Sequence, residues 1–306
     1  MAVKIKNQGI YAALVNQLDK LARHNRQGSF RTRERYYEAC KRFCAYLADE
    51  YHLQKLENIS GKHLTSYVLW MQESGKSAST MKTDLAAIRF FHDKMSRPKY
   101  RLPANDELAV ELERRRFGQT DRTWSNAEFN RMLGKALAED RYDFILALYL
   151  ARYAGLRIHE CFRIDTAIAE QALRENAITI KGKGGKVRTA PINEQIALAM
   201  KKQLERTARG HKLLVPDGIP TDRAIKRLQF FILRNRDSIQ EPGRDTPLTF
   251  HGLRHVYAAE TYKKLVEGGM RELDAHFAVS KLLGHERPDV TNIYLASVRK
   301  GGADGK

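Results

Sequence analysis

Apolar residues recur every three or four positions through the first hundred residues, and this spacing is typical of amphipathic helices. The pattern predicts a helix before residue 28, a second over 31–50, and two more over about 61–74 and 77–95. The apolar faces of the first two contain Ile10, Leu14, Leu18, Leu21, Tyr36, Cys40, Phe43 and Leu47. Because each predicted helix has one apolar face, the helices can pack around a shared core. We therefore expect residues 1–105 to form an all-helical domain.

The apolar periodicity stops between residues 96 and 122, where prolines and charged residues become frequent. Pro98 and Pro103 interrupt helices, because proline lacks a backbone N–H and its ring clashes with the preceding turn. A short helix is expected near residues 105–116. We interpret residues 106–121 as a basic linker between two domains.

A second domain is predicted over residues 122–306, with helices arranged around one short β-hairpin. Ser125 and Glu128 have the spacing of a capping box, which marks the start of a helix. The further elements expected are a helix from Tyr142 to Tyr153 that ends at Gly155, strands over 177–181 and 186–192, and two helices within 194–236. The fold class is therefore mainly α with a small β-sheet.

The stretch from Phe250 to Leu295 predicts short, capped helices. Thr249 is a suitable N-cap for a helix that begins at Phe250. The apolar stretch before Gly284 predicts a second helix that ends there, because glycine adopts the left-handed conformation at helix ends. Tyr294 is expected one or two turns inside the helix that follows.

The amino-acid composition indicates which kind of molecule the protein binds. The formal net charge is +18, which favours a polyanion such as DNA. The three cysteines include no CxxC pair, so no zinc site is predicted, and neither a metal nor a cofactor is expected. An odd cysteine count without a signal peptide indicates the cytoplasm. No apolar run approaches the ~20 residues that span a bilayer, so no membrane association is expected.

The candidate chemistry gathers in the same C-terminal stretch. Arginine binds phosphate oxygens through a fixed fork of donors, histidine transfers protons near neutral pH, and a phenol can act as a covalent nucleophile. His251 and Arg254 are three residues apart and share a helix face, as do Arg157 and Glu160 further upstream. Together with Tyr294, these side chains suit phosphate chemistry.

Four motifs occur in a fixed order along residues 122–296. Residues 154–160 are AGLRIHE, residues 182–188 are GKGGKVR, residues 251–255 are HGLRH, and residues 282–285 are LLGH, with Tyr294 nine residues after His285. This order resembles the catalytic domain of the tyrosine recombinases, the phage integrase family. Residues 1–105 resemble the helical core-binding domain of that family in length and helical pattern. The resemblance implies a two-domain DNA clamp.

The resemblance also implies the role of each residue. Tyr294 would attack the scissile phosphate of DNA and form a 3′-phosphotyrosyl bond. Lys183 would protonate the leaving 5′-oxygen, and Lys181 is the second candidate for that role. The other catalytic residues implied are Arg157, His251, Arg254 and His285, with Glu160 and His255 in supporting roles.

Basic residues on the two predicted helices of 194–236 would track a phosphate backbone. They include Lys201, Lys202, Arg206, Arg223, Lys226 and Arg227. The expected partner is double-stranded DNA, and exchange between two duplexes requires a homotetramer on DNA. The predicted function is site-specific recombination, for integration or excision of a mobile element. A type IB topoisomerase, a telomere-resolving enzyme and a non-catalytic DNA-binding regulator are the alternatives.

Overall fold

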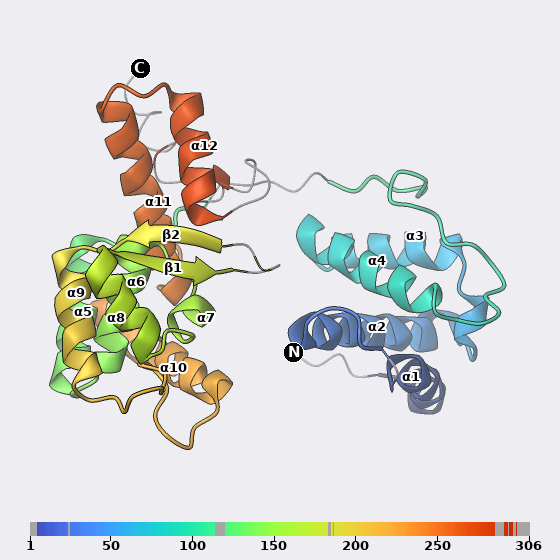
Figure 1. Cartoon of the computed structure of the whole chain (residues 1–306). Coiled ribbons are helices and arrows are strands. Elements are labelled where there is room, and N and C mark those ends of the chain that lie inside the picture. The colour runs from blue at the N-terminus through green and yellow to red at the C-terminus, as the bar shows by residue number, and fades with distance from the viewer. Residues whose placement is uncertain are drawn as a thin grey trace. The chain divides into compact units, whose positions relative to one another are not determined.

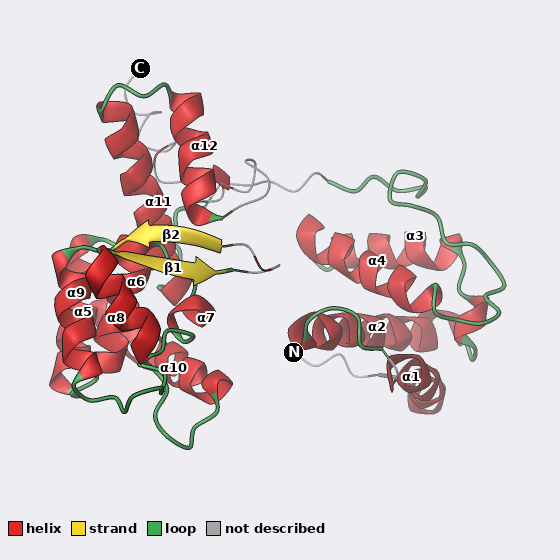
Figure 2. Cartoon of the chain, in the orientation of Figure 1, coloured by secondary structure: helices red, strands yellow, loops and turns green. Residues whose placement is uncertain are grey.

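The computed structural model describes residues 5–23, 25–113, 120–182, 185, 187–284, 291, 292, 294, 295 and 298. The chain divides into two compact units, an N-terminal unit (Met1–Arg115) and a C-terminal unit (Arg116–Lys306). Figure 1 shows both units with their elements labelled. Figure 2 shows helices and loops in the first unit, and helices with one two-stranded hairpin in the second. The predicted fold class, mainly α with a small β-sheet, is confirmed.

Helices form the described part of the N-terminal unit, as predicted. They are α1 (Gln8–Arg23), α2 (Phe30–Tyr51), the short 3₁₀ helix η1 (Leu56–Asn58), α3 (Gly61–Glu73) and α4 (Ala78–His92). Ser29 and Ser77 start α2 and α4, because each side chain accepts the backbone N–H three residues on. Helix α4 ends three residues before the predicted position 95.

Residues 105–113 form no helix, so the helix expected near 105–116 is wrong over this part, and its remaining residues lie outside the described ranges. The physical reason is tertiary. Alternate residues of the segment (Leu108, Val110 and Leu112) pack against the core of the N-terminal unit. Side chains of α3 and α4 also hold its backbone: Gln72 donates to the carbonyl of Glu111, and Lys82 donates to that of Glu113. These contacts favour an extended path over a helix.

The C-terminal unit contains the predicted hairpin and more helices than the sequence pattern indicated. Its elements are α5 (Asn126–Ala138), α6 (Tyr142–Ala154), α7 (Ile158–Cys161), α8 (Thr166–Glu175), β1 (Ala177–Lys181), β2 (Val187–Pro191), α9 (Glu194–Leu204), α10 (Thr221–Ile239), α11 (Phe250–Glu267) and α12 (Glu272–Leu283). The capping box of Ser125 and Glu128 starts α5, as predicted. Helix α8 was not expected from the sequence.

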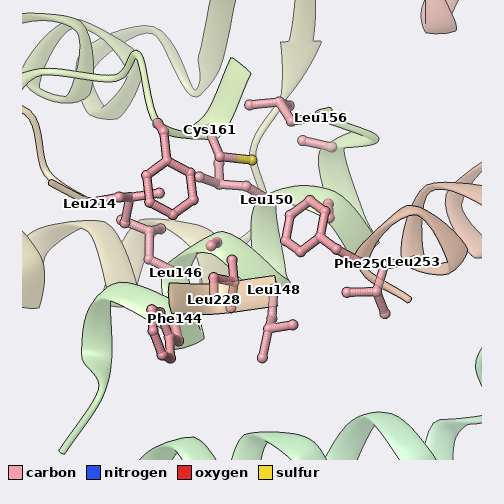
Figure 3. Close-up of a cluster of buried hydrophobic side chains, with 14 of the residues drawn as sticks. Phe144, Leu146, Leu148, Leu150, Leu156, Cys161, Leu214, Leu228, Phe250 and Leu253 are labelled. Carbon is pink, nitrogen blue, oxygen red and sulfur yellow. The ribbon is translucent and has the colours of Figure 1, made fainter. Parts of the chain in front are cut away.

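Helix α6 lies at the centre of this unit and packs against α5, α9 and α11. Its apolar side chains point to more than one side, so it is buried rather than amphipathic. Figure 3 shows Phe144, Leu146 and Leu150 of α6 among the buried side chains of neighbouring elements. Burial of a large aliphatic or aromatic side chain contributes about 1.5–3 kcal/mol. This core fixes the elements that carry the candidate site.

The hairpin is antiparallel and has a buried and an exposed face. Ile178 pairs with Ala190 and Ile180 with Arg188, on the face that meets the core. Lys181 pairs with Val187, and both are exposed. Since side chains alternate along a strand, Lys181 and Arg188 leave the hairpin on opposite faces.

Candidate active site

Two glycines end the helices that border the site, as predicted. Gly155 ends α6 with φ 63° and Gly284 ends α12 with φ 65°, and both values lie in the left-handed region that favours glycine. A Cβ at Gly155 would also lie 2.4 Å from Cδ1 of Tyr257 on α11. The chain can therefore turn sharply at Gly155 and bring α7 beside α11.

Arg254 of α11 is buried and binds the ends of both neighbouring helices. One terminal nitrogen of its guanidinium donates to the carbonyl of Gly155, and the other donates to the carbonyl of Leu283 at 2.5 Å. Burial, followed by the nearby charge of Arg157, lowers the pKa of Arg254 to about 10. The group remains a cation at neutral pH, so it fixes a positive charge inside the site.

Glu160 is a fully buried carboxylate that links two arginines. It accepts hydrogen bonds from Nη1 of Arg157 and Nη2 of Arg188, both at 2.9 Å, and from the backbone N–H of Arg157 at 2.8 Å. Burial opposes its charge, but the backbone hydrogen bond and the charges of Arg188, Arg157 and Arg254 outweigh it and hold the pKa of Glu160 below its ordinary value. Breaking such a buried pair costs roughly 3–5 kcal/mol. Arg157 and Glu160 thus lie side by side, although Arg157 is the extended N-cap of α7 and not part of the helix face that was predicted.

Arg188 belongs to this site, and the sequence analysis missed it. It donates to the carbonyl of Leu282 at 2.9 Å and to that of Gly155 at 3.3 Å, besides its pair with Glu160. One side chain of β2 therefore joins the hairpin to α7 and to the end of α12. The available signal was the alternation along β2, which places Arg188 on the same face as Ala190.

Tyr294 and His251 meet at the first turn of α11. The Tyr294 hydroxyl lies 3.1 Å from Nε2 of His251. Part of the His251 side chain is exposed, yet desolvation and then the cations Arg254, Arg157 and Arg122 lower its pKa to about 4. The imidazole is therefore neutral at pH 7 and can accept the phenolic proton at Nε2.

The surroundings of Tyr294 differ in one respect from the prediction. Tyr294 lies in a turn closed by its own N–H and the carbonyl of Thr291, shortly after the 3₁₀-helical residues Thr291 and Asn292. The sequence placed Tyr294 inside a helix from about Pro288, and the first residues of that helix lie outside the described ranges. Tertiary contacts hold its ring instead: the ring centroid lies 4.5 Å from that of His255 and 5.6 Å from Cζ of Arg254. His255 is buried beside this ring, and its supporting role stays a prediction.

Two residues of the predicted chemistry, Lys183 and His285, fall outside the described ranges, as does Lys186 of the same hairpin turn. Lys181 is described, and its exposed strand face is opposite to the one through which Arg188 reaches Glu160.

A hollow of about 410 Å³ opens beside Arg157 and His251. Gln229, Leu233 and Arg236 of α10 form part of its remaining wall. The predicted DNA-contacting residues lie on α9 (Lys201, Lys202), in the turn after it (Arg206) and on α10 (Arg223, Lys226, Arg227). Nζ of Lys202 on α9 lies 3.8 Å from the ring centroid of Tyr142. Arg206, two residues after α9, pairs with Asp140 at 3.1 Å.

Within the described ranges, no group of three or more His, Cys, Asp or Glu side chains is arranged to hold a metal ion. Over the same residues, no helix combines the length and apolarity needed to cross a bilayer. The predicted independence from metals and cofactors stays a prediction.

Comparisons with known proteins give the class. Residues 125–300 match the phage integrase family, and residues 15–98 match the phage integrase N-terminal SAM-like domain. The chain belongs to the phage integrase family and is a tyrosine-type, site-specific DNA recombinase, as the sequence motifs predicted.

Particular relatives agree over most of their length. Tyrosine recombinase XerC of Pseudomonas aeruginosa (strain LESB58) is 28% identical, with 92% of this chain and 95% of the relative covered. Tyrosine recombinase XerD of Halalkalibacterium halodurans is 24% identical, with 86% of each chain covered. The crystal structure of a lambda integrase dimer bound to a COC′ core site shares the fold, with a TM-score of 0.63, 17% identity and coverage of 93% and 94%.

Proposed function

We propose that this protein exchanges DNA strands by transesterification at Tyr294. The observation that carries the proposal is the contact of the Tyr294 hydroxyl with a neutral His251, next to the buried cation Arg254 and the partly exposed cation Arg157. A nucleophile, a proton acceptor and positive charge thus occupy one place. These are the groups that attack on a phosphodiester requires.

The step is balanced in atoms and protons. The Tyr294 oxygen forms a bond to phosphorus as its proton passes to Nε2 of His251, and the bond from phosphorus to the 5′-oxygen breaks. Arg157 and Arg254 stabilise the negative charge that builds up on the non-bridging oxygens. We assign the proton for the 5′-oxygen to Lys183 and a further hydrogen bond to the phosphate to His285. The reverse reaction with another strand's 5′-hydroxyl completes the exchange without metal or cofactor.

Glu160 and His255 support these groups in our proposal. Glu160 fixes Arg157 through the 2.9 Å pair, so the guanidinium loses less freedom when phosphate binds. His255 packs on the ring of Tyr294 and sets its orientation.

The substrate in this proposal is double-stranded DNA, held as in a clamp by the two domains predicted from the sequence, residues 1–105 and 122–306. The match of residues 15–98 to the SAM-like domain and the net charge of +18 support it. Solved relatives include a lambda integrase tetramer bound to a Holliday junction, and we propose a tetramer on DNA here as well. Solved complexes of the Tn1549 transposon integrase with DNA support a role in moving a mobile element.

Replacing Tyr294 with phenylalanine tests the function. Tyr294→Phe should abolish the covalent protein–DNA adduct on a nicked suicide substrate, while DNA affinity stays within about twofold, since only the nucleophilic oxygen is lost. Tyr149→Phe on α6 is the matched control and should form the adduct normally. An adduct that persists in Tyr294→Phe would remove Tyr294 from the reaction.

A further inference from the structure

The first turn of α11, which carries His251, is held from outside the helix. Thr249 precedes the helix, but its side chain makes no capping hydrogen bond. Its carbonyl instead accepts the indole N–H of Trp124 at 2.9 Å. Trp124 is only 3% exposed and belongs to the main core of the C-terminal unit. A core side chain from the other end of this unit's sequence therefore fixes the start of α11.

Backbone packing reinforces this hydrogen bond at Gly252, the residue after His251. A Cβ at Gly252 would lie 2.4 Å from the carbonyl oxygen of Arg122 and 2.7 Å from Nε1 of Trp124. Real Cβ atoms do not approach other atoms so closely, so the segment Asp121–Trp124 can lie on this turn only because position 252 is glycine. The segment and the turn are thus in direct backbone contact.

The segment is itself anchored. Thr246 donates its hydroxyl to the carbonyl of Asp121 at 2.8 Å, and Arg244 donates to the carbonyl of Thr123 at 2.8 Å. Arg244 also forms a two-pronged pair with the fully buried Glu128, at 2.7 and 2.6 Å. Planar pairs of this kind restrict orientation as well as distance. Asp121–Trp124 therefore behaves as a fixed support for the first turn of α11.

We propose that Trp124 is a positioning residue for His251. It holds the first turn of α11 so that Nε2 of His251 stays within hydrogen-bonding distance of the Tyr294 oxygen. The proposal rests on the function proposed above, because the step it serves is the transfer of the Tyr294 proton. Displacing a reacting group by about 1 Å can cost about a hundredfold in rate. Trp124 itself touches neither DNA nor the reacting atoms in this proposal.

Trp124→Phe is the direct test, because phenylalanine keeps an aromatic ring but cannot donate to Thr249. We expect adduct formation in a single turnover to slow by roughly ten- to a hundredfold, with the dissociation constant for DNA unchanged. Trp70→Phe is the matched control, since it replaces the other tryptophan of the chain, in the N-terminal unit, and should retain the wild-type rate.

A second readout separates positioning from general stability. The His251 pKa is followed in the free protein by NMR, with the signal assigned by its loss in His251→Gln. In Trp124→Phe the His251 pKa should rise towards 6.5, because the ring is less buried and is no longer held beside Arg254, Arg157 and Arg122. Gly252→Ala disturbs the same contact independently, so it should slow adduct formation and shift this titration as well.

The outcomes are decisive. The proposal is overturned if either folded variant keeps both the wild-type rate and the wild-type His251 titration. It is also overturned if neither variant folds, because the support would then be structural alone. If the wild type forms no adduct, the proposed function fails instead, and the titration still tests the placement of His251.

Discussion

At the scale of single residues, each buried charge of the catalytic unit has an opposite charge or a carbonyl beside it. Glu160 lies between Arg157 and Arg188, and Glu128 pairs with Arg244. Arg254 donates to two backbone carbonyls at helix ends. An isolated buried ion would lose several kcal/mol of hydration, so these partners are what allow arginines inside the fold.

His251 gives a pH-dependent prediction at this scale. Its pKa is about 4 in the folded chain and ordinarily about 6.5 in an unfolded one. Between these values the unfolded chain binds a proton that the folded chain does not, so protonation favours unfolding. The contribution of this lowered pKa to folding stability is fully present above about pH 6.5 and declines as the pH falls towards 4. Over this window we expect the free energy of unfolding of the wild type to fall by on the order of 1 kcal/mol more than that of His251→Gln. This figure is discounted for the exposed part of the ring.

Urea unfolding of the C-terminal unit measures this difference. In a Trp70→Phe background, fluorescence comes from Trp124 and reports on that unit alone. Parallel stability curves for the two proteins from pH 7.5 to 4.5 would contradict the lowered pKa.

At the scale of elements, the β-hairpin is joined to the site by one side chain of β2. Arg188 donates to the carboxylate of Glu160 on α7 and to the carbonyl of Leu282 at the end of α12. The hairpin therefore keeps a fixed register relative to the arginines that we assign to the phosphate. The exposed face, with Lys181 and Val187, is turned the other way.

The hairpin lysines can be distinguished by the leaving group. A general acid is needed when an ordinary alkoxide leaves, but a 5′-bridging phosphorothiolate leaves as a thiolate without a proton. Lys183→Ala should cleave normal DNA slowly, by roughly a hundredfold or more, and should be largely rescued on the phosphorothiolate. Lys181→Ala and Lys186→Ala should show weak effects on both substrates.

Cleavage rates on the two substrates decide the assignment. Rescue of Lys181→Ala instead would show that the acid acts from the exposed face of the hairpin. If no lysine variant is rescued, His251 or His285 becomes the candidate for the acid.

At the scale of the whole molecule, excess positive charge is spread over a chain whose two units each have a main core. The N-terminal core is built around α1 to α4, and the C-terminal core around α6. The lysines and arginines of α9 and α10 lie outside both cores, and most of them are exposed. Charges of this kind contribute affinity through the release of counterions from DNA rather than through recognition of bases.

The salt dependence of DNA binding tests the basic residues of α10. Each phosphate contact contributes about 0.9 to the slope of log K against log salt concentration. Lys226→Ala and Arg227→Ala should each reduce the slope by up to about 1 and weaken binding to all sequences alike. Lys264→Ala, an exposed lysine at the end of α11, is the control. An unchanged slope in both α10 variants would place the DNA elsewhere.

The sequence by itself determined most of the helices, several of their ends and the class of chemistry. Apolar periodicity, the capping box at Ser125 and the glycine ends at Gly155 and Gly284 act within a few residues, so they can be recognised locally. Only the tertiary structure decided the extended path of 105–113, the place of Arg188 beside Glu160, the turn around Tyr294 and the support of α11 by Trp124. Trp124 and Thr249 are 125 residues apart in the chain. Contacts over such separations depend on how the elements pack, and no local pattern records them.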